Sequence, residues 1–231
     1  LEYPLDVLAA PADIGHPKPV HGTRPKAAKA DLEAAAKLID GAERPLLLVG
    51  GGTVDCAPAV RAFLEKSGAL GMTTTAGKGV IPASHPASLG SALLTRTMQE
   101  YLASADLVIA AGTELSETDS WVDSLNIPGK IIRIDLDAFT LTRDYPPAVG
   151  ILADAGETLE ALTGMIKGGR KPDLACAAEI REKIRADLKP LERKHVKVLD
   201  ALRAGLPKDG IVVTDMTQIA YTANVYFPNE Q

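Results

Sequence analysis

Short runs of hydrophobic residues alternate along this chain with segments in which hydrophobic residues recur every three or four positions. The short runs have the length of buried strands, and the longer spacing is typical of helices that pack one face against a core. Strands are predicted at residues 46–49, 70–75, 107–111, 131–135 and 149–151, and helices at 28–39, 57–66, 96–103 and 156–167.

This alternation of strand and helix predicts an α/β fold. We expect a doubly wound, mainly parallel, Rossmann-like sheet of about six strands with helices on both faces, because parallel neighbours need crossover connections that are almost always right-handed. We place this domain at residues 26–167.

Proline-rich and charged stretches divide the rest of the chain. Residues 9–25 form a linker in which repeated prolines fix φ and remove backbone donors. Residues 168–206 contain a second linker and a long charged helix that Pro190 divides. A strand-like run at 1–8 and a new strand at 211–215 do not fit into one closed domain. We therefore expect residues 1–8 and 207–231 to be the end and the start of neighbouring domains in a longer polypeptide.

The composition excludes several classes of protein. A formal net charge of −5 with 24% charged and 46% hydrophobic residues excludes a polybasic nucleic-acid binder and a disordered chain. No apolar run approaches the roughly 18 residues of a membrane helix, and the first residues do not have the pattern of a secretory signal. Cys56 and Cys176 are expected to be reduced thiols. We expect a cytoplasmic protein without a nucleic-acid or membrane partner.

Three consecutive glycines, Gly50, Gly51 and Gly52, follow the first strand of the domain and precede a helix. Such a turn brings backbone N–H groups close to a phosphate at the start of a helix. The dinucleotide fingerprint is incomplete, because Asp55 stands at the position of its third glycine. A tight turn needed only for packing fits the pattern equally well.

Lys78 lies in a glycine-containing loop that resembles a P-loop at first sight. The motif is absent, because Met72 stands where its first glycine belongs and Gly79 where it has a hydroxyl. We expect Lys78 to be a solvated or ion-paired lysine.

Carboxylates follow two of the predicted strands, where open α/β sheets collect ligands. Glu114, Glu117 and Asp119 come after the strand at 107–111 and could hold a cation or a hydroxyl-rich ligand. Asp135 and Asp137 end the strand at 131–135 and suit a ribose or an adenine. A polar loop with helix caps and a solvated turn fit equally well.

The predicted strand ends together define one candidate nucleotide site. We nominate no catalytic residue and no metal ligand. The candidate site consists of Gly50, Gly51, Gly52, Thr74, Thr75, Gly112, Thr113, Asp135 and Asp137.

The order of these motifs resembles the central domain of thiamine-diphosphate-dependent enzymes of the acetolactate synthase, pyruvate oxidase and 2-oxo acid decarboxylase type. The resemblance covers nearly the whole chain. It is carried by residues 44–52, 73–86, 89–90, 105–113 and 130–137.

The resemblance implies that residues 1–8 end a pyrimidine-binding domain with a strand and that residues 207–231 begin a diphosphate-binding domain. Met216, Thr217 and Gln218 then match the turn that touches thiamine diphosphate, although many relatives have Gly-Gln-His at the positions of residues 217–219. The activating glutamate and the Gly-Asp-Gly magnesium motif of the family lie outside this chain. The resemblance therefore implies an enzyme that acts on 2-oxo acids with thiamine diphosphate and Mg²⁺. Residues 1–231 are expected to be inactive by themselves.

 The resemblance implies that the whole enzyme is a decarboxylase or a synthase. It also implies that its chemistry depends on the neighbouring domains and on a homodimeric or homotetrameric assembly.

Some members of the family bind FAD or ADP in the central domain. The segments that mark FAD-binding members differ here at residues 91–96 and 114–118, so the resemblance implies FAD or ADP only weakly. Residues 114–119, Glu-Leu-Ser-Glu-Thr-Asp, resemble decarboxylase members, including the guanidino-2-oxopentanoate type. The alternative is a stand-alone NAD- or nucleotide-binding domain of the deacetylase or transhydrogenase type.

Overall fold

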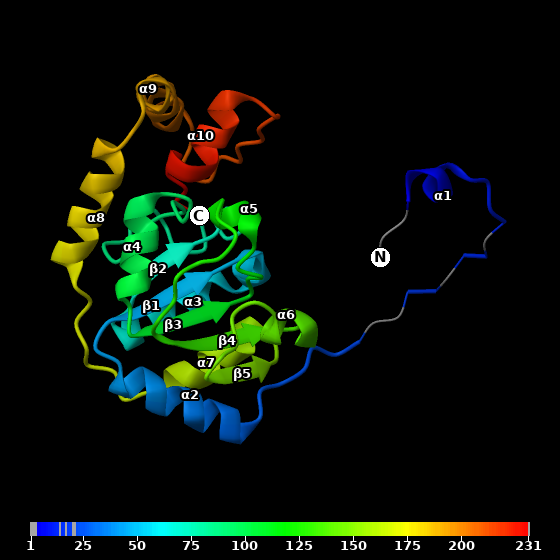
Figure 1. The fold of residues 1–231 in the computed structure, drawn as a ribbon, viewed down its shortest axis with the longest axis vertical. Coiled ribbons are helices and arrows are strands. Elements are labelled where there is room, and N and C mark those ends of the chain that lie inside the picture. Colours follow the sequence, from blue (N-terminus) through cyan, green and yellow to red (C-terminus); the bar gives the residue numbers. More distant parts are fainter. Residues whose placement is uncertain (1–3, 14, 17, 20–21, 231) are drawn as a thin grey trace.

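A five-stranded, fully parallel sheet forms the centre of the molecule (Figure 1). The computed structural model describes residues 4–13, 15–16, 18–19 and 22–230. The strand order is β2-β1-β3-β4-β5, so the chain reverses its direction of winding between β1 and β3. The strands are β1 (Pro45–Val49), β2 (Leu70–Thr73), β3 (Leu107–Ala111), β4 (Lys130–Asp135) and β5 (Val149–Leu152).

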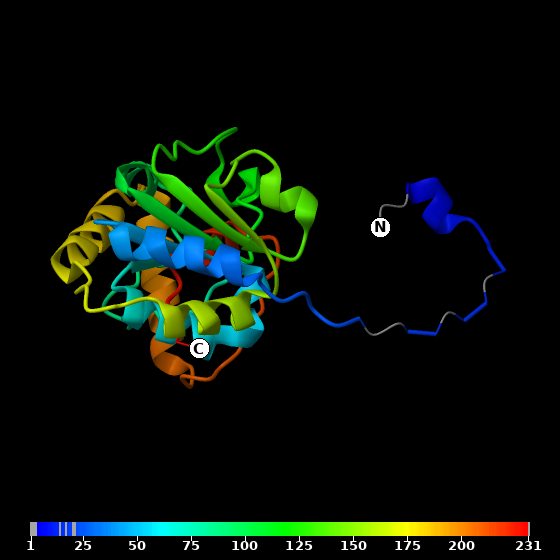
Figure 2. The ribbon, with the colours of Figure 1, turned by 90° about the horizontal axis from the view of Figure 1, so that it is seen from below.

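Helices cover both faces of this sheet, as the alternating pattern predicts. Helix α7 packs against both α3 and α2, and Figure 2 shows α3 and α7 side by side; α4 packs against α8. The helices of the domain are α2 (Lys29–Gly41), α3 (Ala57–Ser67), α4 (Arg96–Ser104), α5 (Glu117–Ser120), α6 (Ala138–Thr142) and α7 (Ala155–Met165), with a 3₁₀ turn η1 (Gly51–Cys56) before α3.

The central strands are hydrophobic along their whole length because both of their faces are covered. Every residue of β1 and β3 is buried, and Leu48 pairs with Ala110 in the middle of the sheet. Continuous apolar runs of this kind are typical of parallel strands between two helical layers. Within the described residues no helix is long and apolar enough to cross a membrane.

The sheet has five strands and not the expected six. Residues 87–90 run beside β2 at the position of a sixth strand, and the Gly71 N–H donates to the Ala87 carbonyl at 2.9 Å. The Leu89 N–H returns a bond to the Gly71 carbonyl at 2.7 Å. The Gly90 carbonyl still accepts from the Thr73 N–H at 3.0 Å, but Gly90 has a left-handed φ of 76°, which ends the extended conformation. The segment therefore contributes one isolated bridge and no strand.

The C-terminal part of the described chain is helical. The long charged helix is divided at Pro190, as predicted, into α8 (Leu174–Ala186) and α9 (Pro190–Gly205), and α10 (Gln218–Tyr226) follows. The strand predicted at 211–215 is wrong, because these residues pair with no strand of the described chain. Ile211 and Val213 are 89% and 90% exposed. Residues with a high propensity for strands form a strand only where a neighbouring strand can hydrogen-bond to their backbone groups.

The strand expected at residues 1–8 is also not found. Residues 1–3 lie outside the described residues, and Leu5–Ala9 forms the short helix α1, whose residues are all exposed. Figure 1 shows α1 lying apart from the sheet.

Candidate functional site

A cavity of about 590 Å³ opens at the carboxyl ends of β1, β2 and β3. It lies at the point where the winding of the sheet reverses, which is the usual ligand position in open α/β folds. Its volume falls within the range of about 300–1,000 Å³ that is common for small-molecule sites. The residues that line it are Gly51, Gly52, Thr74, Thr75, Ala76, Leu94, Gly112, Thr113, Glu114, Ser116, Thr118, Asp119, Trp121, Tyr221 and Asn224.

Glycines allow the turns after β1 and β3 to touch. A Cβ atom on Gly50 would lie 2.4 Å from the Gly112 carbonyl oxygen, and one on Gly52 would lie 2.8 Å from the Gly112 Cα. Gly112 itself has a φ of 57°. The glycine run is therefore needed for a close backbone approach, which is the packing alternative that the sequence left open.

The same contact uses backbone donors that a phosphate would need. The Gly50 N–H donates to the Ala111 carbonyl at 3.0 Å, and the Gly52 N–H donates to the Gly112 carbonyl at 3.0 Å. The Thr53 N–H donates to the Gly50 carbonyl at 3.1 Å. These three donors are consequently satisfied inside the turn and do not point at a free anion.

The loop after β3 supplies one wall of the cavity. Leu115 and Trp121 both adopt left-handed backbone conformations, with φ of 54° and 55°. Such conformations are uncommon for residues other than glycine. Leu115 is buried in the core, whereas Trp121 is 65% exposed. The loop is thus anchored at one end and presents an aromatic ring at the other.

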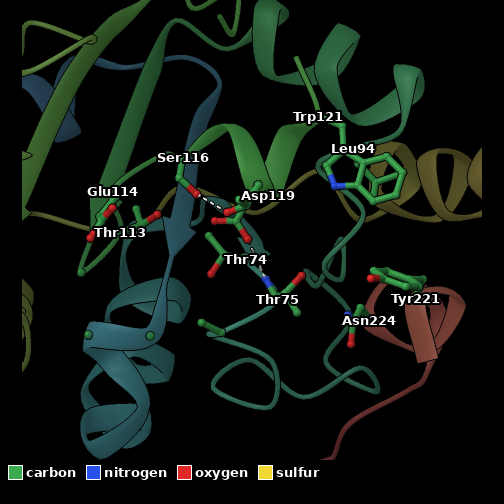
Figure 3. A pocket seen from close by; sticks show the side chains of 15 residues that line it. Thr74, Thr75, Leu94, Thr113, Glu114, Ser116, Asp119, Trp121, Tyr221 and Asn224 are labelled. Atoms are coloured by element: carbon green, nitrogen blue, oxygen red, sulfur yellow. Dashed lines mark hydrogen bonds between the residues drawn. The ribbon is translucent and has the colours of Figure 1, made fainter. Parts of the chain in front are cut away.

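Asp119 lies in the middle of this wall, between Glu114 on one side and Trp121 on the other (Figure 3). Its Oδ1 accepts a hydrogen bond from the Thr75 N–H at 3.3 Å. Burial raises the pKa of the Asp119 carboxyl from its ordinary value, and the negative charge of Glu114 raises it further, against the hydrogen bonds that lower it. The hydrogen bonds to the Asp119 carboxylate therefore stabilise its negative charge only in part.

Arg133 on β4 supports the loop from beneath. Its side chain is buried, and its guanidinium donates to the carbonyl oxygens of Thr113 at 3.2 Å and Arg143 at 3.0 Å. A further bond at 3.4 Å reaches the Glu114 carbonyl. Burial lowers the pKa of this guanidinium from its ordinary value. Its donors are occupied by backbone carbonyls, so Arg133 shapes the loop.

The opposite wall comes from α10, which contributes Tyr221 and Asn224 (Figure 3). Lys78 Nζ donates to the Ala223 carbonyl at 2.7 Å and to the Asn224 carbonyl at 3.2 Å. Ser91 Oγ donates to the Asn224 carbonyl at 2.9 Å. The expectation that Lys78 is solvated or ion-paired is wrong, because it is packed under this helix, and burial lowers its pKa to about 8.

A second cavity of about 220 Å³ adjoins the first and holds the end of β4. Asp135 and Asp137 line it, and it shares Gly52, Gly112 and Thr113 with the first cavity. Asp137 also caps α6, since its Oδ1 accepts from the Phe139 N–H at 2.8 Å. The predicted strand-end residues are therefore brought together around two neighbouring hollows, with Gly50 in the turn behind them. Their contact with a nucleotide stays a prediction.

The three residues expected to touch thiamine diphosphate lie just before and at the start of α10. Met216 is 84% exposed. Thr217 caps the helix, because its Oγ1 accepts from the Ala220 N–H at 3.3 Å, and Gln218 is the first helical residue. None of the three lines the cavities described above. Their role in cofactor binding stays a prediction.

Seven residues of the larger cavity were not nominated from the sequence: Ala76, Leu94, Ser116, Thr118, Trp121, Tyr221 and Asn224. Tyr221 and Asn224 follow an exposed segment that the hydrophobic pattern assigned to a different domain. Trp121 carried a signal, because it is the only tryptophan of the chain and stands close to three carboxylates. In the described part of the chain, no group of three or more His, Cys, Asp or Glu residues is placed to hold a metal ion.

A model of the thiamine pyrophosphate enzyme central domain matches residues 32–162. Over 237 aligned residues the chain is 39% identical to the probable 2-ketoarginine decarboxylase AruI of Pseudomonas aeruginosa. It is 26% identical to the acetolactate synthase isozyme 1 large subunit of Escherichia coli over 238 residues. Each alignment covers 98% of this chain and 42% of the relative, so the chain spans less than half of their length.

The fold agrees with a solved structure. An X-ray structure from Mycobacterium smegmatis, described as a thiamin diphosphate-dependent enzyme, superposes with a TM-score of 0.69 at 21% sequence identity. The match covers 91% of this chain and 41% of that one. At this identity the likeness establishes the fold.

Proposed function

Because this chain belongs to the family of thiamine pyrophosphate enzyme central domains, we propose that it serves as the central domain of a thiamine-diphosphate-dependent enzyme that acts on 2-oxo acids. The observation that carries the proposal is the alignment of 98% of the chain with a relative named as a 2-ketoarginine decarboxylase. That alignment runs through α8, α9 and α10, beyond the parallel sheet itself.

Decarboxylation is favoured over acetolactate synthesis. Identity is 39% to the decarboxylase and 26% to the synthase over nearly the same length. The segment at residues 114–119, which suggested a decarboxylase of a guanidino-substituted 2-oxo acid, forms the carboxylate wall of the larger cavity. We propose the 2-oxo acid derived from arginine as the first substrate to test.

Met216, Thr217 and Gln218 are proposed to contact thiamine diphosphate in the complete enzyme. They form a turn at the N-terminus of α10, whose backbone donors favour an anionic group. When bound, thiamine diphosphate supplies the carbanion chemistry, and a protein supplies orientation and charge. Only one edge of such a site is present in residues 216–218. We propose that Mg²⁺, the domains that precede and follow this one, and a homodimeric or homotetrameric assembly complete it.

The alternative of a stand-alone NAD- or nucleotide-binding domain is not favoured. The relatives align with α8–α10 as well as with the sheet, which an isolated nucleotide-binding domain does not explain. FAD and ADP are not part of the proposal either. The donors of Gly50 and Gly52 are used by carbonyls of the neighbouring turn, so this turn offers them to no diphosphate.

The proposal is tested with the complete protein encoded by the gene that contains this sequence. With thiamine diphosphate and Mg²⁺ we expect decarboxylation of 2-oxo acids, fastest for the arginine-derived one, and loss of activity when the cofactor is omitted. The 231-residue chain alone is the matched control and is expected to show no turnover. A complete protein without thiamine-dependent turnover of any 2-oxo acid would contradict the proposal.

A further inference from the structure

The charge around the two cavities has one sign. Glu114 and Asp119 line the larger cavity, and Asp135 and Asp137 line the smaller one, which also includes Glu114. Among the described residues, no lysine, arginine or histidine lines either cavity. An anionic ligand would therefore be repelled, whereas a cation would be attracted into a site that is partly shielded from water.

Two basic residues, Arg133 and Lys78, contact the backbone of the cavity walls, but they do not neutralise the carboxylates by ion pairs. Arg133 donates to the carbonyls of Thr113, Glu114 and Arg143 from beneath the loop. Lys78 donates to the carbonyls of Ala223 and Asn224 on the other side of α10. Neither forms an ion pair with Glu114 or Asp119 in the described chain.

Aromatic rings stand at the side of the cavity opposite Glu114. Trp121 follows α5 and Tyr221 lies in α10, and the two are 65% and 48% exposed (Figure 3). Cations bind over the faces of such rings, and tryptophan is the best of them. A guanidinium group also stacks on aromatic rings and donates in its plane to carboxylates. The aromatic rings and the carboxylates are separate features of the cavity, and each favours a cationic ligand.

A metal ion fits the cavity less well than an organic cation. The described chain has no cluster of three or more potential protein ligands for a metal. The volume of about 590 Å³ is much larger than an ion needs, and hydroxyls of Thr74, Thr75 and Ser116 add acceptors around the carboxylates. An extended cation with several donors can use these acceptors together.

We propose that the cavity between the β1–β3 strand ends and α10 binds a small organic cation that carries a planar guanidinium group. Asp119 accepts hydrogen bonds from the guanidinium, Trp121 and Tyr221 cover its face, and Glu114 adds negative charge at the opposite side of the cavity. The inference rests on the proposed function only in its choice of a guanidinium ligand, and the binding test below requires no turnover, so the two can fail separately.

Binding in this cavity also stabilises the position of α10. Tyr221 and Asn224 provide part of the wall, so a ligand that contacts them binds only the docked helix. A ligand that binds one of two states shifts the equilibrium toward that state. Hydrogen exchange of residues 218–226 is therefore expected to slow when the ligand is present.

Fluorescence of Trp121 measures binding directly, because it is the only tryptophan of the chain. The probes are L-arginine, its nearly isosteric neutral analogue L-citrulline, and ADP as an anion. We expect saturable quenching by arginine, with citrulline bound about tenfold or more weakly, since hydrogen bonds to charged groups are worth about 1.5–3 kcal/mol. Binding of arginine is expected to weaken with added salt.

Charge-removing substitutions identify the site. The double variant E114Q/D119N keeps the shape of both side chains and is expected to lose the preference for arginine over citrulline. E117Q is the matched control, because Glu117 carries the same charge in the same loop but does not line the cavity. It is expected to bind arginine as the wild-type chain does. Thermal unfolding checks that each variant is folded.

Three results would overturn the inference: equal affinity for arginine and citrulline, tighter binding of ADP than of arginine, or unchanged arginine binding in E114Q/D119N. Absence of saturable quenching, with calorimetry also showing no heat of binding, would overturn it as well. The comparison of arginine with citrulline uses the wild-type chain, so it decides the question even where the double variant does not fold.

Discussion

Lys78 Nζ lies 2.7 Å from the carbonyl oxygen of Ala223, although 145 positions separate the two residues in the chain. The ammonium group thus meets the carboxyl end of α10, where the Ala223 carbonyl also accepts from the Phe227 N–H at 3.0 Å. A cation at this end also interacts favourably with the helix dipole. This single side chain joins the loop after β2 to the helix that closes the larger cavity.

Replacing Lys78 by methionine is expected to loosen α10. K78M keeps most of the aliphatic volume but removes the ammonium donor from the carbonyls of Ala223 and Asn224, which retain the Phe227 N–H and the Ser91 hydroxyl. Hydrogen bonds to charged groups contribute about 1.5–3 kcal/mol. Amide exchange in residues 218–226 should accelerate by about tenfold or more. K37M is the matched control, because Lys37 is exposed on α2, and it should leave this exchange unchanged.

The stability of the chain should also depend on pH through Lys78. Burial lowers its folded-state pKa from 10.5 to about 8. Between these values the unfolded chain holds the proton and the folded chain has released it, so stability rises with pH, by up to about 1 kcal/mol per pH unit. Below about pH 8 both states are protonated and this contribution is constant. Urea unfolding across this range should show the rise in wild type but not in K78M; equal slopes would contradict it.

Two glycines should respond to alanine with opposite signs. Gly112 has a φ of 57°, and a Cβ there would lie 2.8 Å from the Gly52 backbone, so G112A should destabilise the fold by about 2 kcal/mol or more. Gly164 lies in α7 with open space around its Cα, so G164A should stabilise the fold by about 0.5–1 kcal/mol. Chemical denaturation measures both. A neutral G112A would show that the two turns can separate without cost.

Removing the guanidinium of Arg133 should destabilise the loop after β3. R133M removes the guanidinium donors to the carbonyls of Thr113 and Arg143, of which the Arg143 carbonyl keeps the Tyr145 N–H, and we expect a loss of about 2–3 kcal/mol. R133K keeps the charge without the planar fork and should fall between wild type and R133M. Arg96 pairs with Glu100 on the surface, so R96M is the control and should barely change the melting temperature.

The sheet could be predicted because its signals are local. The apolar runs at 46–49 and 107–111 and the helices between them follow from periodicity within short windows. The expected sixth strand had no residues assigned to it, and the segment at 87–90 beside β2 forms only one isolated bridge. The run at 211–215 has the propensity of a strand, yet pairing requires a neighbour that no local pattern reveals.

The candidate site was predicted in part for the same reason. The strand ends at Gly51, Thr74 and Thr113 meet because parallel strands finish at one edge of the sheet. The placement of Tyr221 and Asn224 depends on contacts with Lys78 and Ser91 across more than a hundred residues. Lys78 was predicted to be solvated or ion-paired, because the local sequence of a glycine-rich loop does not indicate that a distant helix, α10, covers it.

Because α10 forms one wall of the larger cavity, the residues that line the cavity extend beyond the residues that match the family model. The family match ends at residue 162, whereas Tyr221 and Asn224 lie beyond α8 and α9. A chimaera that exchanges residues 32–162 between two relatives would carry the sheet but combine its strand ends with a foreign helix. Exchange of the segment through Phe227 would keep both sides of the cavity from one parent. Recombination boundaries in such proteins therefore belong after α10.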